Sequence, residues 1–307
     1  MEKATNDIKI KNMDQTIKNK CGKSQFELLI NKGWIFPQND GQFIINEKFY
    51  EVMQLFDTAF FAWAKKDGAK EYFYPDFYTV SDLDNCDYIK QFHGHCMFTG
   101  TTTNDLFDIK NLRFSKYINN PAICMHCYIQ HRNTVINEEK PIVITAKGRC
   151  KRNERNGFIS LERMLDFTMR EIVFIGTKDF VLFKRQEYIE RAKSLLETLH
   201  LEGNISLSND PFFKKEDNIK AEFQRKFKLK YELNLKNYDN GHSVAVGSFN
   251  YHNYNFTKAY NIKMTNGNLA HTACIAFGLE RIAYTYITQV GIDGCYQRLN
   301  EYIQYMD

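Results

Sequence analysis

No stretch of this 307-residue chain approaches the ~20 consecutive apolar residues that a membrane helix needs. The first 20 residues are polar and lysine-rich and contain no apolar signal-peptide region. We therefore expect a cytoplasmic protein without a membrane partner. In that compartment the eight cysteines stay mostly reduced, so those that matter should act as metal ligands or reactive thiols.

A strong charge of one sign is also missing. The chain has 41 basic and 37 acidic residues, a net charge of +4, which is too balanced to indicate a nucleic-acid binder. The motifs GxGxxG and GxxxxGK[ST] are absent, and the predicted strands and helices do not alternate as βαβ units. Both absences argue against a doubly wound nucleotide-binding fold.

The residues that are present can bury a large core, since 43% of them are hydrophobic and 15% aromatic. We expect one large domain over residues 41–307, preceded by an N-terminal leader, residues 1–40. Strands outnumber helices and are joined mostly by short links, which predicts an α+β domain with an antiparallel sheet. Strands are expected at Pro141–Cys150, Phe227–Leu235 and His271–Phe277, helices at Phe183–Leu201 and Leu279–Val290, and a loop at Thr99–Asp105.

An amphipathic helix is predicted over Asn46–Trp63, where large apolar residues recur at helical spacing. Such a stripe is more often core or subunit interface than a cofactor site. The strand-like Glu71–Val80 follows, and Pro75 within it indicates an edge or interface strand.

The central strand is predicted at Met169–Ile175, where both alternating sets of side chains are largely apolar. Glu171 and Arg170 should point to opposite faces of it. A buried carboxylate needs a cation, a metal ion or several donors, because burying it unpaired costs several kcal/mol. An internal ion pair and a ligand-binding role both fit Glu171 at this point.

Two further segments could carry chemistry. In PAICMHCY, Cys124 and Cys127 have CxxC spacing, but no second metal-ligand pair follows to close a zinc finger, so ordinary buried thiols remain the simpler interpretation. In CKRNERNGFISLER the basic residues could form a solvated turn or an anion clamp, because a guanidinium matches phosphate oxygens bidentately.

Taken together, CKRNE…LERMLDFTMREIVFIG and TACIAFGLERIAY resemble motifs 2 and 3 of the class II aminoacyl-tRNA synthetases, with the seryl branch nearest. With PAICMHCY, NDPFF (Asn209–Phe213) and SFNYH (Ser248–His252), the likeness extends from about Gly41 to Gly291. It is specifically to the amino acid:carrier-protein ligases, which resemble the catalytic domain of the zinc-dependent seryl-tRNA synthetases of methanogens. The resemblance implies a class II sheet flanked by helices and a homodimer, with Asn46–Trp63 and the Pro75 strand in the position of motif 1.

The resemblance also implies a zinc site formed by Cys124, Glu171 and Cys274 on separate strands, with the fourth position open for the amino group of the amino acid. Glu171 would orient that group. Cys124 is preferred over Cys127 because it stands four residues before Tyr128, as in the family's C-x-x-x-Y pattern.

For ATP, the resemblance places Arg152 on the α-phosphate and Arg281 as a second clamp, because preorganised cations stabilise the charge that develops when a carboxylate attacks phosphorus. Glu154 would lie near the adenine amino group. Arg163 and Met164 would close on the nucleotide. Glu232, Ser248 and Asn250 would hold Mg²⁺ and the nucleotide. The register of the loop Asn153–Ser160 against the family stays open.

The implied function is ATP-dependent activation of a small amino acid, glycine or alanine, as an aminoacyl adenylate, followed by transfer to the phosphopantetheine thiol of a carrier protein. Only some 45 residues precede the Asn46–Trp63 helix, and they show no heptads, so the long coiled coil with which seryl synthetases reach tRNA is not expected. A tRNA-charging enzyme is the alternative. A catalytically silent paralogue with a regulatory role is a third, disfavoured by the presence of Arg152, Glu171 and Arg281.

Overall fold

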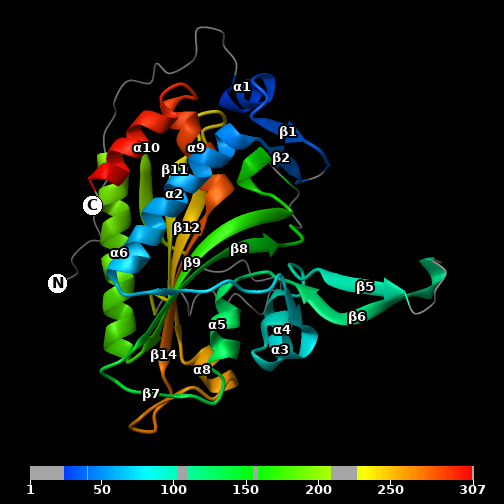
Figure 1. Ribbon diagram of the computed structural model, residues 1–307, viewed down its shortest axis with the longest axis vertical. Helices are drawn as coiled ribbons and strands as arrows, with labels where there is room; N and C mark the ends of the chain where they lie inside the picture. The colour runs from blue at the N-terminus through cyan, green and yellow to red at the C-terminus, as the bar shows by residue number, and fades with distance from the viewer. Residues whose placement is uncertain are drawn as a thin grey trace.

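A seven-stranded sheet forms the centre of the computed structural model, which describes residues 24–39, 41–102, 109–154, 158, 160–208 and 227–305 (Figure 1). Its strand order is β10-β11-β12-β14-β9-β8-β3, and every neighbouring pair is antiparallel except β3 and β8. The expected antiparallel α+β fold is thus confirmed. The strands are β3 (Lys70–Glu71), β8 (Ile142–Lys151), β9 (Asp166–Gly176), β10 (Gly203–Leu207), β11 (Lys230–Lys236), β12 (Ser243–Asn253) and β14 (His271–Gly278).

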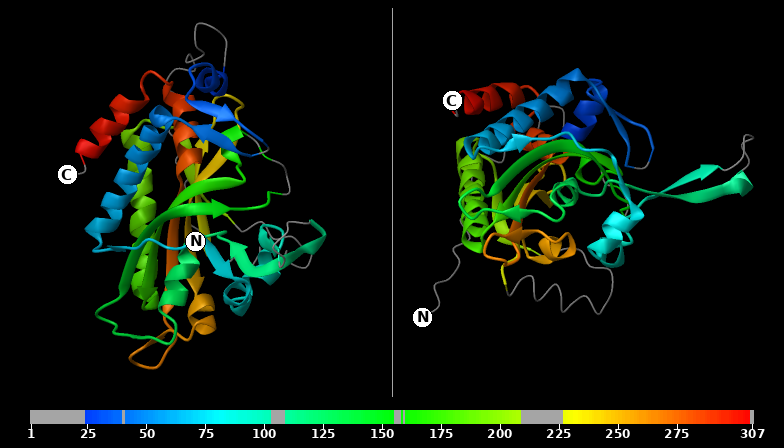
Figure 2. Two further views of the ribbon diagram at one scale, coloured as in Figure 1. Left: turned by 45° about the vertical axis from the view of Figure 1, so that its right-hand side comes forward. Right: turned by 60° about the horizontal axis from the view of Figure 1, so that its bottom comes forward.

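Helices cover both faces of this sheet (Figures 1 and 2). On one face lie α2 (Glu47–Lys66), α6 (Lys178–Thr198), α9 (Leu279–Val290) and α10 (Cys295–Gln304). On the other lie α3 (Val80–Asn85), α4 (Tyr88–Phe92), α5 (Cys124–Gln130) and α8 (Asn255–Ala259). Strand β9 serves both layers, because Ile172 and Phe174 join the first core and Val173 and Ile175 the second.

Three smaller sheets complete the fold. They are the hairpin of β1 (Ile35–Pro37) and β2 (Phe43–Ile45), the pair of β7 (Val135–Ile136) and β13 (Lys263–Met264), and a three-stranded sheet in the order β4-β6-β5. The last consists of β4 (Phe77–Thr79), β5 (Phe98–Thr102) and β6 (Leu112–Asn119), and short 3₁₀ turns occur at Ile109–Asn111 and Ser160–Glu162.

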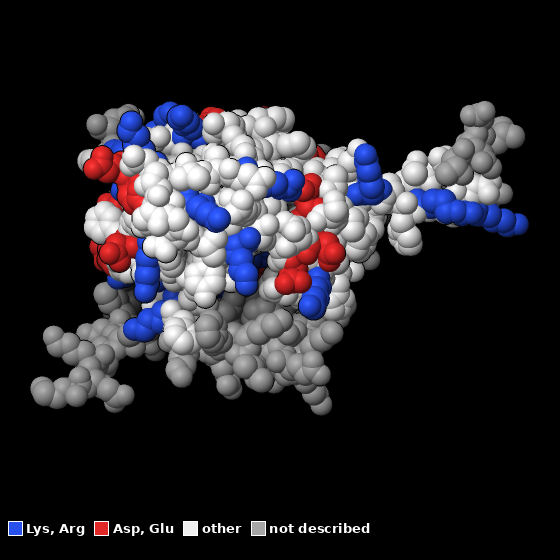
Figure 3. Space-filling view, turned by 90° about the horizontal axis from the view of Figure 1, so that it is seen from below, with Lys and Arg blue, Asp and Glu red and all other residues white. Residues whose placement is uncertain are grey.

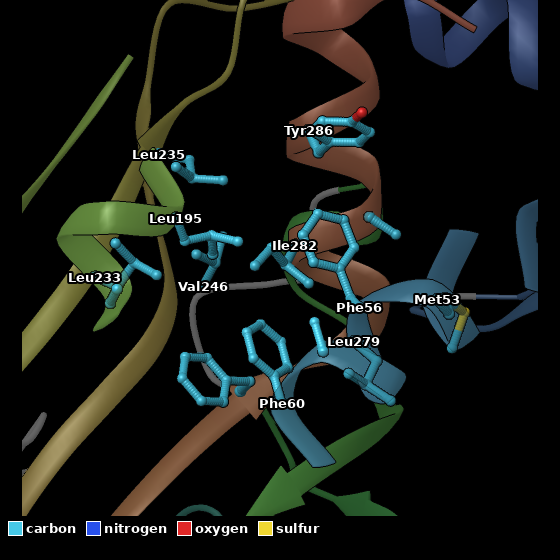
Figure 4. Packing of buried hydrophobic residues seen from close by; sticks show 14 of the residues in the cluster. Met53, Phe56, Phe60, Leu195, Leu233, Leu235, Val246, Leu279, Ile282 and Tyr286 are labelled. Carbon is cyan, nitrogen blue, oxygen red and sulfur yellow. The ribbon is translucent and has the colours of Figure 1, made fainter. Parts of the chain in front are cut away.

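The aromatic stripe of α2 is buried within its own chain and forms the centre of the larger core (Figure 4). Phe60 stacks on Phe277 of β14 with ring centroids 3.8 Å apart, and Phe56 packs edge-on against Tyr286 of α9 at 5.3 Å. The stripe was interpreted as either core or subunit interface, and the structure places these residues in the core.

Several expected boundaries are wrong for physical reasons. Helix α6 begins at Lys178 rather than Phe183, because Thr177 caps it by accepting a hydrogen bond from the Phe180 N–H. The segment Glu71–Val80 is not one strand: only its ends, in β3 and β4, join sheets, and Pro75 lies in the gap between them. Thr99–Thr102 belongs to β5 instead of a loop, since it pairs with β6.

The N-terminal part of the described chain is packed rather than loose. Helix α1 (Gln25–Asn31) carries a Ser24–Glu27 capping box, and the carboxylate of Asp239 accepts hydrogen bonds from the backbone N–H groups of Gln25 and Phe26. Leu29 is fully buried in the larger core. The expected division at residue 40 therefore does not coincide with a break in packing. The expected NDPFF turn at Asn209–Phe213 lies outside the described residues.

None of the helices in the described ranges combines the length and the apolarity that crossing a membrane would require.

Candidate active site

A cavity of about 290 Å³ opens on the sheet face that carries α4, α5 and α8. Side chains of β9, β12 and β14 form its floor, and Arg152 and Glu154, which follow β8, close one side together with the start of α9. Ten of the eleven predicted site residues line it: Cys124, Arg152, Glu154, Met164, Glu171, Glu232, Ser248, Asn250, Cys274 and Arg281.

The three predicted metal ligands meet at the floor of the cavity. The ligand atoms of Cys124, Glu171 and Cys274 all lie within 4.8 Å of one another, and the three residues are buried. The Cys274 thiol donates to Glu171 Oε2 at 3.4 Å. The neighbouring Cys124 thiol, burial and the Glu171 carboxylate together hold the pKa of the Cys274 thiol well above its usual range. The expected placement on three strands is wrong for Cys124, which begins helix α5.

The backbone at the start of α5 fixes the Glu171 carboxylate. The N–H groups of Ile123 and Cys124 donate to its two oxygens at 3.1 and 2.8 Å. Two thiols and a carboxylate, buried and converging, are a donor set that fits Zn²⁺. Cys127 lies on the same helix but outside this group, in agreement with the preference for Cys124.

Arg170, the neighbour of Glu171, points to the other face of the sheet, as expected. The internal ion pair in this strand is formed by Arg170 and not by Glu171. The Arg170 guanidinium contacts Asp57 of α2 at 2.6 Å and Glu71 of β3 at 2.9 Å. Glu171 itself forms no salt bridge with any described residue, so the ligand-binding interpretation fits it better.

Two guanidinium groups line the same cavity without a salt bridge to any described carboxylate. Arg152 follows β8, donates from Nε to the Pro121 carbonyl at 2.8 Å and lies 5.3 Å from the centre of the Phe167 ring. Arg281 lies in the first turn of α9 and donates to the Ala245 carbonyl at 2.8 Å. Burial lowers the pKa of Arg281, and the nearby Arg152 adds to this effect. An anionic ligand would offset the cost of burying these two charges and the repulsion between the two guanidinium groups.

The remaining predicted residues with polar side chains form ion pairs or hydrogen bonds with their neighbours. Glu154 pairs with Arg163 at 3.7 Å, and Arg163 is the one predicted residue that does not line the cavity. Glu232 pairs with Lys230 at 3.0 Å and lies opposite Ser248 in the β11–β12 register. Asn250 donates to Ser248 Oγ at 3.0 Å. Of the open loop Asn153–Ser160, residues 155–157 and 159 lie outside the described residues.

The sequence analysis missed Glu280, which is 1% exposed beside Arg281. Its carboxylate accepts hydrogen bonds from the Thr168 N–H at 2.7 Å and from Arg149 Nη1 at 3.1 Å. Burial raises its pKa. Glu280 thus joins the start of α9 to strands β8 and β9. This contact fixes the position of the neighbouring Arg281. The sequence contained a signal that could have identified Glu280: it is an acidic residue directly before the motif-3 arginine, at the start of a predicted helix.

Aromatic and imidazole side chains from outside the motifs also line the cavity. They include Tyr88 and Phe92 of α4 and His95 after it. No spacing in the sequence connects α4 to the motif strands, so only the folded chain brings it to this cavity.

The fold is that of the class II aminoacyl-tRNA synthetase catalytic domain. The chain superposes with a TM-score of 0.77 on the seryl-tRNA synthetase of M. kandleri, taken from a crystal structure in complex with A. aeolicus tRNASec. That match covers 91% of this chain and 60% of the synthetase at 21% identity, so it shows the fold alone.

In sequence, the chain is a homologue of two groups of ligases. It is 37% identical over 133 residues to amino acid--[acyl-carrier-protein] ligase 1 of Bradyrhizobium diazoefficiens, a match that covers 43% of this chain and 41% of the relative. It is 33% identical over 191 residues to the type-2 serine--tRNA ligase of Methanocaldococcus jannaschii, covering 60% of this chain and 37% of the relative. No family model matches the chain. These matches confirm the resemblance seen in the motifs. The chain spans less than half the length of each of these two relatives.

Proposed function

We propose that the protein activates a small amino acid with ATP and passes it, as an aminoacyl group, to the phosphopantetheine thiol of a carrier protein. The observation that carries the proposal is one cavity lined by two different kinds of group. Arg152 and Arg281 supply two partly buried guanidinium groups that form no salt bridge with any described carboxylate, and Cys124, Glu171 and Cys274 supply a metal-type donor set. Together they fit a molecule with a phosphate and one with an amino group.

In the first step the amino acid carboxylate attacks the α-phosphorus of ATP, and the bond from that phosphorus to the pyrophosphate oxygen breaks. Arg152 and Arg281 stabilise the charge that develops on the phosphoryl oxygens. Glu280 keeps Arg281 in place through its hydrogen bond to the Thr168 N–H. Glu232, Ser248 and Asn250 would offer oxygen and amide groups to the nucleotide and to Mg²⁺. Glu154 and Met164 close its adenine side, and Arg163 acts there through its ion pair with Glu154.

In the same cavity, Cys124, Glu171 and Cys274 would hold Zn²⁺, which when bound supplies a Lewis-acidic position for an amino group. The backbone N–H groups of α5 orient the Glu171 carboxylate toward this position. In the second step the acceptor sulfur bonds to the carbonyl carbon, the bond from that carbon to the AMP oxygen breaks, and the thiol proton is released.

We also propose that the protein acts as a cytoplasmic homodimer. Because the α2 stripe is buried within its own chain, other apolar residues must form the interface. Phe73, two residues before Pro75, is 94% exposed, and Phe77 of β4 is 47% exposed. Exposed apolar side chains of this size indicate a surface that another protein covers.

The activation step is tested by ATP–pyrophosphate exchange with a panel of amino acids. We expect exchange with ATP, Mg²⁺ and glycine or alanine, in the absence of any acceptor. A protein that binds ATP yet shows no exchange with any amino acid would support the silent-paralogue alternative instead.

A further inference from the structure

The hairpin of β5 and β6 projects from the body of the molecule as an arm (Figures 1 and 2). A hairpin of two strands is at best marginally stable in water unless something covers one of its faces. In the orientation of Figure 1 the outer part of this arm extends into solvent, beyond the layers of helices. Its described residues are 98–102 and 109–119.

The two faces of the arm differ. Phe98, Leu112 and Phe114 share one face, because β5 and β6 pair Phe98 with Ile118, Gly100 with Phe114 and Thr102 with Leu112. Phe114 is 86% exposed, and its ring meets that of Phe98 at 6.4 Å. The opposite face carries Thr99 and Ser115, whose hydroxyls are hydrogen-bonded to each other. An exposed apolar strip on a projecting ribbon indicates a docking surface.

The charge of the arm indicates what kind of partner fits. Its described residues include Lys110, Arg113 and Lys116 and no Asp or Glu, and in Figure 3 the described part of the arm shows blue side chains and no red ones. Arg113 and Lys116 are exposed and form no salt bridge with any described residue. The two acidic residues of the hairpin sequence, Asp105 and Asp108, lie outside the described residues. A partner with an acidic surface around an apolar contact is complementary to this arm.

Both ends of the arm join the lining of the active-site cavity. His95 precedes β5, Ala122 follows β6, and both line the cavity. The two residues that follow β8 are hydrogen-bonded to both roots: the Asn153 N–H donates to the His95 carbonyl at 3.1 Å, and Arg152 Nε to the Pro121 carbonyl at 2.8 Å. A protein bound along the arm therefore lies beside the cavity and next to the residue proposed to hold the α-phosphate.

We propose that the β5–β6 arm is the docking surface for the acceptor, a small acidic carrier protein that reaches the cavity with its flexible thiol arm. This inference rests on the proposed function and adds the surface that recognises the partner. The apolar strip supplies the contact, the cations raise the association rate, and the roots of the arm place the carrier at the cavity.

The test compares two acceptors. Phe114→Ser and Arg113→Glu are assayed for transfer of the activated amino acid to a holo-carrier protein and, separately, to free pantetheine, which needs no docking surface. Matched controls are Phe183→Ser, an exposed phenylalanine on α6 (62% exposed), and Lys48→Glu, an exposed lysine on α2. Pyrophosphate exchange measures the first step for every variant, and light scattering measures its oligomeric state.

We expect each arm variant to lower kcat/KM for the holo-carrier about tenfold, the usual effect of losing one central interface residue. Exchange and transfer to pantetheine should stay within about twofold of the unaltered protein, as should all activities of the controls.

Arm variants that keep full activity with the carrier, or lose transfer to both acceptors equally, overturn the docking inference. So does conversion of a dimer to a monomer with loss of exchange, since the arm would then hold a second copy of the chain. An unaltered protein without exchange, or with exchange but no label on any holo-carrier, overturns the proposed function and the inference together.

Discussion

Two neighbouring residues on β9 have separate roles because a strand alternates its faces. Arg170 binds Asp57 and Glu71 on the side of α2, and Glu171 meets two thiols on the side of the cavity. The ion pair fixes α2 against the sheet, while the carboxylate is left for a ligand. Moving the register of β9 by one residue would exchange these roles.

Replacing Cys274 tests the metal donor set. We expect the purified protein to carry one zinc per chain and Cys274→Ser to lose it, because a thiolate ligand is replaced by a poorer one. Metal analysis by mass spectrometry measures the zinc directly, without recourse to activity. Cys127→Ser is the matched control, since Cys127 is a buried thiol on α5 outside the cluster. Full zinc occupancy in Cys274→Ser would remove this residue from the site.

Arg281→Lys tests the second phosphate clamp. A lysine keeps the charge but loses the planar fork, so we expect pyrophosphate exchange to fall about 100-fold with little change in thermal stability. Arg132→Lys is the control, because Arg132 pairs with Asp82 and does not line the cavity. Equal losses in the two variants would indicate a general effect of replacing arginine rather than a role for Arg281.

At the scale of elements, Asp67, the C-cap of α2, joins that helix to α6. Its carboxylate, 4% exposed, pairs with Lys184 at 2.8 Å and Arg191 at 3.0 Å. Burial alone would raise the pKa of Asp67, but hydrogen bonds from these two cations outweigh burial and the pKa is lowered. A lowered folded-state pKa adds stability above the ordinary value of 3.8, and this stability is lost as the pH falls through the folded value.

We therefore expect Asp67→Asn to lower the free energy of unfolding by about 1–3 kcal/mol at neutral pH, because two partly buried cations lose their partner. The difference between variant and unaltered protein should shrink below pH 3.8. Urea unfolding at both pH values measures it. Asp293→Asn breaks an exposed pair with Lys32 and should change stability by less than about 1 kcal/mol. A difference for Asp67→Asn that does not depend on pH would contradict this account.

Elements with a strong period were predictable from the sequence, and those that depend on distant partners were not. The α2 helix, the β8–β9 hairpin and the change from β14 to α9 at Gly278 follow from spacing and local turns. The arm was not predictable, because the Thr-rich β5 is a strand only through its pairing with β6. Among the site residues, motif-like segments gave Arg152, Glu171 and Arg281, whereas α4 reaches the cavity only in the folded chain.

At the scale of the whole molecule, the exposed Phe73 predicts assembly. We expect light scattering to give twice the 36.2 kDa mass of the chain, and Phe73→Glu to shift it toward a single chain, because a charge in an apolar interface is poorly solvated. Phe183→Glu on α6 is the control and should leave the mass unchanged. A single-chain mass for the unaltered protein at micromolar concentration would refute the dimer.

The nature of the acceptor is the central claim, because the cavity alone fits both groups of relatives. The most direct measurement offers the unaltered protein a radiolabelled small amino acid with ATP and Mg²⁺, in one reaction with holo-carrier protein and in another with total tRNA. We predict label on the carrier that is released by hydroxylamine, as a thioester is, and none on apo-carrier or tRNA. Label on tRNA and none on any holo-carrier would contradict the account and identify a tRNA-charging enzyme.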